Sequence, residues 1–220
     1  MFGLIAATLV LGPPPKGTLV ILGGGTESPA AFRKVLEVAQ GSLVVLDHSR
    51  EELGKSSAAL KDAFTELGAK EVRTPTSAAE ILDALKNARG VYLSGGDQKR
   101  FMERLPEASG VPAAMRAVLA RGGVIGGSSA GATIQGEYLV RGSPVVNTIM
   151  MAEGYERGFN FLPGAAIDQH FTQRGRAPDM QTLKRTFPQL LGLGIDEATA
   201  VVVRGTELEV IGDNTVSIYP

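Results

Sequence analysis

The sequence contains no cysteine and no tryptophan, and it has only two histidines, His48 and His170. Without cysteine the chain can form neither a disulfide nor a thiolate metal site. Because there are only two histidines, any mechanism that needs an imidazole has two candidate residues. The net charge of −1 argues against a basic surface for nucleic acid or for an anionic membrane.

Residues 1–15 differ from the rest of the chain, because the apolar stretch Met1–Gly12 is followed by a run of prolines. This stretch has no positively charged start and no convincing small-residue cleavage site, and it is too short to cross a bilayer. We therefore expect an N-terminal arm over 1–15, with a strand or packing segment at Ala7–Leu11, and a single domain over 16–220. A lipid-facing anchor is the alternative. We expect a cytoplasmic protein.

Between Lys16 and Arg121, short apolar runs alternate with segments whose apolar residues recur at helical spacing. The expected strands are Thr18–Leu22, Leu43–Asp47, Glu71–Thr74 and Gly90–Ser94. The expected helices are Pro29–Ala39, Ser57–Leu67, Ser77–Asn87, Gln98–Leu105 and Val111–Arg121. This alternation predicts an α/β fold with a mainly parallel sheet covered by helices on both faces.

The chain after Gly136 begins with a glycine-rich connection, Tyr138–Pro163. The apolar runs beyond it are Ala165–Asp168, Gly192–Asp196, Ala200–Val203, Glu207–Ile211 and Val216–Tyr219. We expect the last three to form an antiparallel meander whose final turn is Asp213-Asn214.

The segment Gly127-Ser128-Ser129-Ala130-Gly131 matches G-x-S-x-G, a pattern that places a serine on a sharp turn between a strand and a helix. The glycines are needed because a Cβ two residues from the nucleophile would collide with a neighbouring element. Unpaired N–H groups at the start of the helix suit a developing oxyanion. The alternative is a Gly/Ser-rich loop without chemistry.

Several polar or glycine-rich segments follow predicted strands, where the sites of parallel sheets gather. One of them, Gly23–Ser28, fails the dinucleotide pattern G-x-G-x-x-G because Ser28 replaces the third glycine. We expect close backbone packing near a site there. His48, which stands beside Asp47, is the competing base.

The second histidine lies in Asp168-Gln169-His170-Phe171, at the end of a predicted strand. Strand alternation puts Asp168 and His170 on one face and Gln169 on the other. This pair indicates either a catalytic base with a carboxylate beside it or a structural hydrogen bond. Neither histidine has metal-ligand spacing, so we predict no metal and no other cofactor.

Adjacent carboxylates, Asp196 and Glu197, stand between two apolar runs. In extended backbone they face opposite ways, so at most one can orient a histidine, and the alternative is an ordinary acidic turn. The chain order Ser129, His170, Glu197 differs from that of the α/β-hydrolases, chymotrypsin and subtilisin. Because a triad is defined by geometry and role, this order argues against those folds and not against catalysis.

A third charged segment, Gln173-Arg174-Gly175-Arg176, follows His170 closely. It presents two guanidiniums on a flexible glycine, which suits bidentate binding of a carboxylate. A solvated basic loop explains the segment equally well.

Four motifs together resemble the cyanophycinase branch of the serine peptidase family that also contains dipeptidase E. They are Ser94–Gln98, Gly127–Ala132, Asp168–Arg176 and Gly194–Ala200, in the family's order. The likeness runs from about Lys16 to Tyr219. It implies a three-layer αβα sandwich similar to class I glutamine amidotransferases (flavodoxin-like), with serine in place of their cysteine, and by analogy a homodimer.

The resemblance also implies roles for individual residues. Ser129 would be the nucleophile, His170 the general base and Glu197 the third triad member. The N–H groups of Gly96 and Ala130 would form the oxyanion hole. The family's substrate-pocket positions are occupied by Gln98, Asp168, Gln169, Arg174 and Arg176.

Two local differences refine this expectation. In the dipeptidase E branch the acidic triad member is an aspartate after the nucleophile helix, but Gly142–Val146 contains no acid, which favours Glu197. Asp179 stands where cyanophycinases tend to have a third arginine.

We therefore expect a serine peptidase acting on small or aspartate-containing peptides. An aspartyl dipeptidase or general exopeptidase, and a non-catalytic peptide-binding module, are the alternatives; an amidotransferase-like subunit is disfavoured because it needs a cysteine.

Overall fold

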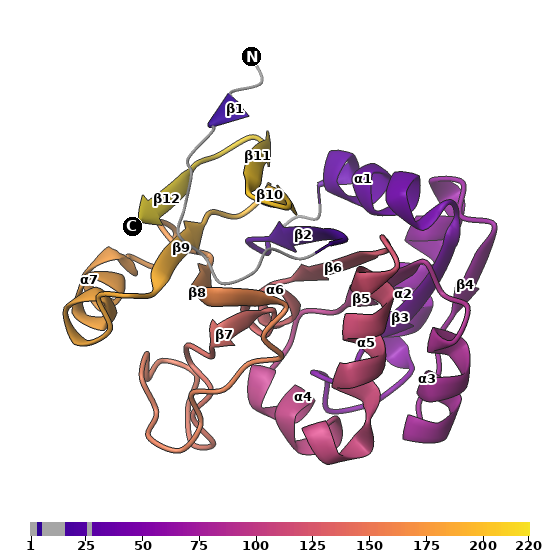
Figure 1. Cartoon of the computed structure of the whole chain (residues 1–220), viewed down its shortest axis with the longest axis horizontal. Helices are drawn as coiled ribbons and strands as arrows, with labels where there is room; N and C mark the ends of the chain where they lie inside the picture. Colours follow the sequence, from indigo (N-terminus) through magenta and orange to yellow (C-terminus); the bar gives the residue numbers. More distant parts are fainter. Residues whose placement is uncertain (1–3, 6–15, 26–27) are drawn as a thin grey trace.

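The structure, a computed structural model, describes residues 4–5, 16–25 and 28–220 (Figure 1). The segment expected at Ala7–Leu11 lies outside these residues. Within the described part of the chain, the strands form an eight-stranded and a four-stranded sheet. No helix in that part is both long and apolar enough to cross a bilayer.

The larger sheet has the order β1-β11-β10-β2-β6-β5-β3-β4. Its strands are β1 (Leu4–Ile5), β2 (Thr18–Leu22), β3 (Ser42–Leu46), β4 (Glu71–Arg73), β5 (Gly90–Leu93), β6 (Val124–Ser128), β10 (Thr199–Arg204) and β11 (Glu207–Gly212). The strands from β2 to β4 pair in parallel, and β10, β11 and β1 extend the sheet in antiparallel pairing. The predicted α/β fold with a mainly parallel sheet is confirmed.

Helices cover both faces of this sheet because their apolar residues recur every three to four positions. On one face, Phe32, Phe64 and Tyr92 form an aromatic cluster with ring centroids 4.4–5.2 Å apart. That face carries α1 (Pro29–Ala39) and α2 (Lys55–Glu66). The other face carries α3 (Ala78–Leu85), α4 (Gln98–Arg104), the short 3₁₀ helix η1 (Glu107–Ser109), α5 (Val111–Ala120) and α6 (Ala130–Thr133). The helices on both faces of the sheet that the alternating pattern predicted are therefore present, as is the three-layer sandwich that the resemblance implied.

The smaller sheet lies against the side of this sandwich and carries α7 (Figure 1). Its order is β12-β9-β8-β7, and its elements are β7 (Gly136–Tyr138), β8 (Leu162–Gln169), β9 (Leu191–Ile195), β12 (Val216–Tyr219) and α7 (Ala177–Thr186). Residues of β8 and β9 share one hydrophobic core with β2, β5 and β6. This shared core supports a single domain over 16–220, which stays a prediction.

The predicted C-terminal meander is wrong in its last strand. β10 pairs with β11 as expected, but β12 pairs with β9 in the other sheet. The carboxylate of Asp196 accepts hydrogen bonds from the Thr215 N–H at 3.2 Å and from its hydroxyl at 2.7 Å. The Asn214 N–H donates to Thr199 Oγ1 at 2.9 Å. These bonds turn the chain back toward the end of β9, so β12 continues along that strand.

Candidate active site

The G-x-S-x-G segment forms the strand-to-helix turn that its glycines predict. Ser129 sits between β6 and α6 with φ 53° and ψ −111°, a backbone conformation rare for a residue with a side chain. A Cβ on Gly127 would lie 2.2 Å from the carbonyl oxygen of Gly131, and one on Gly131 would lie 2.1 Å from that of Leu93. Only glycine fits at either position, which confirms the expected close packing around the serine.

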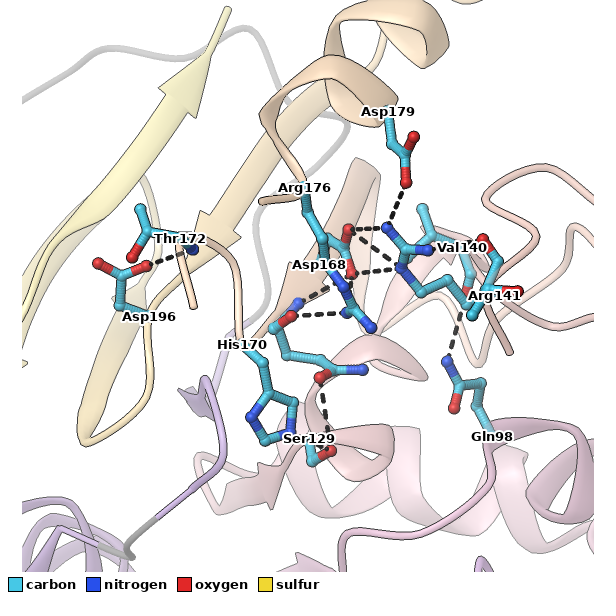
Figure 2. Close-up of polar contacts among 12 residues, drawn as sticks. Gln98, Ser129, Val140, Arg141, Asp168, His170, Thr172, Arg176, Asp179 and Asp196 are labelled. Carbon is cyan, nitrogen blue, oxygen red and sulfur yellow. Dashed lines mark hydrogen bonds and ion pairs between the residues drawn. The ribbon is translucent and has the colours of Figure 1, made fainter. Parts of the chain in front are cut away.

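Three side chains from separate elements form a continuous chain of hydrogen bonds at this turn. Ser129 Oγ lies 3.0 Å from His170 Nε2, and His170 Nδ1 lies 2.5 Å from Glu197 Oε1. Because the carboxylate accepts the Nδ1–H, the neutral imidazole keeps Nε2 free to accept the serine proton. The His170 side chain is 9% exposed and that of Glu197 is 36% exposed. The structure thus joins the three residues that the sequence proposed as a triad (Figure 2 shows Ser129 and His170).

The prediction that Gln169 faces away from His170 is wrong. β8 ends at Gln169, and His170 has φ 48°, so the alternation of strand side chains stops between them. Gln169 Oε1 lies 3.5 Å from Ser129 Oγ, on the side of His170. The His170 N–H donates to the Gly23 carbonyl at 2.8 Å, and a Cβ on Gly24 would lie 2.5 Å from the His170 ring. The glycine run after β2 therefore packs against the imidazole, as its composition suggested.

The pKa of His170 is lowered from its ordinary value of 6.5. Burial is the main cause, and the positive charges of Arg174 and Arg176 lower the pKa further, whereas Glu197 raises it. The imidazole is therefore uncharged at neutral pH, which is the form that can accept a proton from Ser129.

The competing residues of the sequence analysis lie elsewhere. His48 is buried, its Nε2 lies 3.1 Å from the Thr76 carbonyl oxygen, and burial lowers its pKa. Asp196 accepts hydrogen bonds from Thr215 and, at 2.9 Å, from the Thr172 N–H, on the far side of the loop from His170 (Figure 2). Both residues stabilise loops, and neither contacts Ser129.

The oxyanion-hole candidates lie close to the serine. A Cβ on Gly95, the residue before Gly96, would lie 3.3 Å from the Cβ of Ser129. Neither the Gly96 N–H nor the Ala130 N–H donates a hydrogen bond to another described residue. Gln98 begins α4 and is buried, and its Nε2 donates to the Val140 carbonyl at 3.3 Å (Figure 2).

A buried network of charges lies behind the site, and it includes Arg141, which the sequence analysis missed. Arg141 Nη2 lies 3.0 Å from Asp168 Oδ2 and 2.8 Å from Asp179 Oδ2, while Arg176 Nη1 lies 2.6 Å from Asp168 Oδ1 (Figure 2). The side chains of Arg141, Asp168 and Arg176 are 3%, 0% and 6% exposed. An arginine after two apolar residues gave no sequence signal, because its partners come from distant elements.

The two arginines after His170, both expected to bind a substrate carboxylate, lie in different surroundings. Arg176 pairs with Asp168 and also donates to the Gln169 carbonyl at 2.6 Å. Burial lowers the pKa of Arg176 to about 10, against the opposing charge of Asp168, so the guanidinium stays charged at neutral pH. Arg174 is exposed and forms no ion pair with a described residue. Of the two arginines, Arg174 is therefore the one that is exposed and without an ion pair to a described residue.

Replacing Arg141 with methionine is expected to lower the free energy of unfolding by about 3 kcal/mol, because removing one partner leaves buried carboxylate charge insufficiently compensated. Urea denaturation followed by circular dichroism measures this difference. Arg174→Met, at an exposed position without an ion pair, is the matched control and should change stability by less than about 0.5 kcal/mol. Equal stabilities of the two variants would show that the network contributes little.

Comparison with solved structures shows the same fold. A peptidase from an acI-B1 Actinobacterium superposes with a TM-score of 0.71 at 21% identity, over 93% of this chain and 91% of that one. A putative peptidase E protein from Listeria monocytogenes EGD-e superposes with a TM-score of 0.68 at 19% identity, over 90% and 99%. At these identities the two superpositions establish the shared fold.

The family model of peptidase family S51 matches residues 49–211, and the chain belongs to this family. A cyanophycinase from Trichormus variabilis is 28% identical over 228 residues, which cover 94% of this chain and 74% of the relative. A cyanophycinase from Synechococcus elongatus is 28% identical over 221 residues, covering 91% and 67%. The protein is thus a serine-type peptidase, and the resemblance drawn from its motifs is confirmed.

Proposed function

We propose that the protein hydrolyses small peptides with a carboxylate near the scissile bond, through a Ser129–His170–Glu197 triad and an acyl-enzyme. The hydrogen-bond chain from Ser129 Oγ to His170 at 3.0 Å and on to Glu197 at 2.5 Å carries this proposal. It has the contacts that a nucleophile, a general base and an orienting carboxylate require.

In the proposed mechanism, Ser129 Oγ attacks the peptide carbonyl carbon while His170 Nε2 takes its proton. The N–H groups of Gly96 and Ala130 donate to the oxyanion of the tetrahedral intermediate. This intermediate collapses, the C–N bond breaks, and His170 gives its proton to the leaving amine. Water then attacks the ester carbonyl carbon while His170 Nε2 takes its proton, and the C–O bond to Ser129 breaks as His170 returns that proton to Ser129 Oγ, which releases the acid product. Glu197 holds the ring tautomer and stabilises the imidazolium in both steps.

The charges around the site favour a substrate with one carboxylate at this position. Asp168 and Asp179 already neutralise Arg141 and Arg176, which leaves Arg174 as the available guanidinium. Asp179 pairs with Arg141 in the network, and it occupies the position where cyanophycinases tend to have a third arginine. A long polyaspartate chain would therefore find few cationic contacts, so we propose small peptides rather than cyanophycin as the better substrates.

A dipeptide-library screen that includes β-linked Asp-Arg tests this substrate class. We expect free acids and aspartyl peptides to be cleaved faster than amidated neutral peptides. An aspartyl dipeptidase or a more general exopeptidase would use the same triad and would differ in the preferred position of the carboxylate. Equal cleavage of neutral, amidated peptides would contradict the proposed pocket, and a preference for cyanophycin would contradict the inference from Asp179.

A homodimer is the proposed assembly, which light scattering tests.

Replacing Arg174 with alanine is expected to raise KM for carboxylate-bearing peptides by roughly 10–100-fold, because one charge-assisted contact is lost. Steady-state kinetics with an acidic peptide and its amidated analogue measure this effect, and KM for the analogue should hardly change. If both substrates are affected equally, Arg174 does not bind the carboxylate.

The same variant should shift the pH dependence. Protonated His170 cannot act as a base, so kcat/KM falls as pH drops through its pKa, which lies below the ordinary 6.5. Because the charge of Arg174 lowers this pKa, Arg174→Ala should move the acid limb to higher pH. Arg174→Lys keeps the charge and should leave the acid limb nearly in place.

A further inference from the structure

Ser49 lies behind the proposed oxyanion hole and has no part in the mechanism above. It follows β3 in the chain and is 1% exposed. Its Oγ lies 3.0 Å from the carbonyl oxygen of Gly95, 3.1 Å from that of Ser94 and 2.9 Å from Ser94 Oγ. Its own carbonyl oxygen accepts the Asp97 N–H at 2.9 Å. Ser49 therefore holds the connection between β5 and α4 at both ends.

The hydroxyl of Ser49 has one proton, which limits how these contacts can be made. If Ser94 Oγ donates to Ser49 Oγ, the proton of Ser49 is left for the two carbonyl oxygens. Both carbonyls can only accept, so in this arrangement they share the single proton of Ser49 in a three-centre hydrogen bond. The Gly95 carbonyl is thereby bonded on the side of Ser49.

The peptide between Gly95 and Gly96 transmits this bond to the site. In a trans peptide the C=O and the N–H point in opposite directions. With the Gly95 carbonyl directed at Ser49, the Gly96 N–H is directed away from Ser49. A Cβ on Gly96 would lie 2.6 Å from the Ser49 carbonyl oxygen, and one on Gly95 would lie 3.3 Å from the Ser129 Cβ. The connection is thus packed between Ser49 and the nucleophile.

We propose that Ser49 is a positioning residue that aims the Gly96 N–H at the oxyanion, an inference that rests on the proposed function. Its hydroxyl never touches the substrate. It fixes the Gly95–Gly96 peptide plane before the substrate binds, so the amide needs no reorientation when negative charge develops. Its contribution is therefore expected in the transition state more than in substrate binding.

The test compares Ser49→Ala with the wild-type protein in kcat, KM and the inhibition constant of a peptide aldehyde, whose adduct with Ser129 places an oxygen in the oxyanion hole. We expect kcat to fall roughly 10–100-fold, with KM changed by less than about threefold. This fall in kcat is at most that expected when one donor of an oxyanion hole is removed. The aldehyde should bind more weakly by a similar factor. Unchanged kcat and unchanged aldehyde affinity would overturn the proposal.

Ser57→Ala is the matched control. Ser57 is also buried, lies in the first turn of α2, and its hydroxyl donates to the Gly54 carbonyl at 3.1 Å, with no hydrogen bond to the β5–α4 connection. It should leave all three constants near wild type, and a loss equal to that of Ser49→Ala would overturn the proposal as general loosening. If Ser49→Ala does not fold, Ser49→Cys is measured instead, because its thiol has a similar shape and is a weaker hydrogen-bond donor. A kcat of Ser49→Cys below wild type supports the proposal, and a wild-type kcat overturns it.

Ser129→Ala separates this inference from the proposed function. If peptide hydrolysis persists in Ser129→Ala, the nucleophile assignment fails, and the role of Ser49 fails with it. If hydrolysis is lost in Ser129→Ala while Ser49→Ala behaves as wild type, only the role of Ser49 fails.

Discussion

Replacing Ser129 with alanine is expected to lower kcat by about a millionfold, the loss seen when a serine nucleophile is removed from a triad. The hydroxyl of Ser129 lies 3.0 Å from the imidazole nitrogen that would take its proton, and no alanine can form the acyl-enzyme. Hydrolysis of the best peptide from the library screen, followed by chromatography of the products, measures the loss.

The neighbouring serine provides the control. Ser128 is the last residue of β6, where it pairs with Leu22 of β2, and it is 3% exposed. Its side chain is therefore buried within the packed sheet. Ser128→Ala should keep kcat within about tenfold of wild type, because it removes no group that the mechanism uses. An inactive Ser128→Ala beside an active Ser129→Ala would show that the turn presents the other hydroxyl.

Replacing Glu197 with glutamine is expected to lower kcat by about 10³–10⁴-fold while the fold stays intact. The amide cannot stabilise the imidazolium as a carboxylate does, and it no longer fixes the Nδ1–H tautomer across the 2.5 Å contact. Steady-state kinetics measure the loss, and circular dichroism checks the fold.

Asp196→Asn is the matched control, because the adjacent carboxylate has no contact with His170. Burial raises the pKa of Asp196, but hydrogen bonds from Thr215 and Thr172 outweigh it, so the pKa is lowered overall. Its ionised form therefore stabilises the fold at neutral pH, and this stability is lost as pH falls through the lowered pKa. Asp196→Asn should lower the free energy of unfolding, and it should lower kcat much less than Glu197→Gln does. A larger loss of kcat in Asp196→Asn than in Glu197→Gln would assign the third triad position to Asp196.

The features that the sequence predicted well are those that depend on neighbouring residues. The glycines around Ser129 mark a turn whose packing excludes a Cβ, and the alternating apolar runs mark the parallel strands. Ser77 and Glu80 form a capping box at the start of α3, and their spacing of three residues is the usual sequence pattern of that motif. Each of these signals is local, so the spacing of a few residues is enough to show it.

The features that the sequence did not predict depend on partners far apart in the chain. Arg141 is buried only because Asp168 and Asp179 meet it, and Ser49 reaches the Ser94 and Gly95 carbonyls only because β3 lies beside β5. His170 leaves strand geometry through a positive φ that no residue pattern announces. α7 was not expected, since its buried face consists of only Met180 and Leu183. Such contacts are set by tertiary packing, which overrides local propensity.

The most direct measurement of the central claim is the site of covalent modification by a fluorophosphonate, mapped by tandem mass spectrometry. Trypsin releases residues 122–141 as one peptide, whose only serines are Ser128 and Ser129, and fragment ions separate the two. The proposed mechanism predicts one phosphonyl group on Ser129 and slower labelling of Glu197→Gln. Labelling of Ser128 instead, or undiminished peptide hydrolysis by Ser129→Ala, would contradict it.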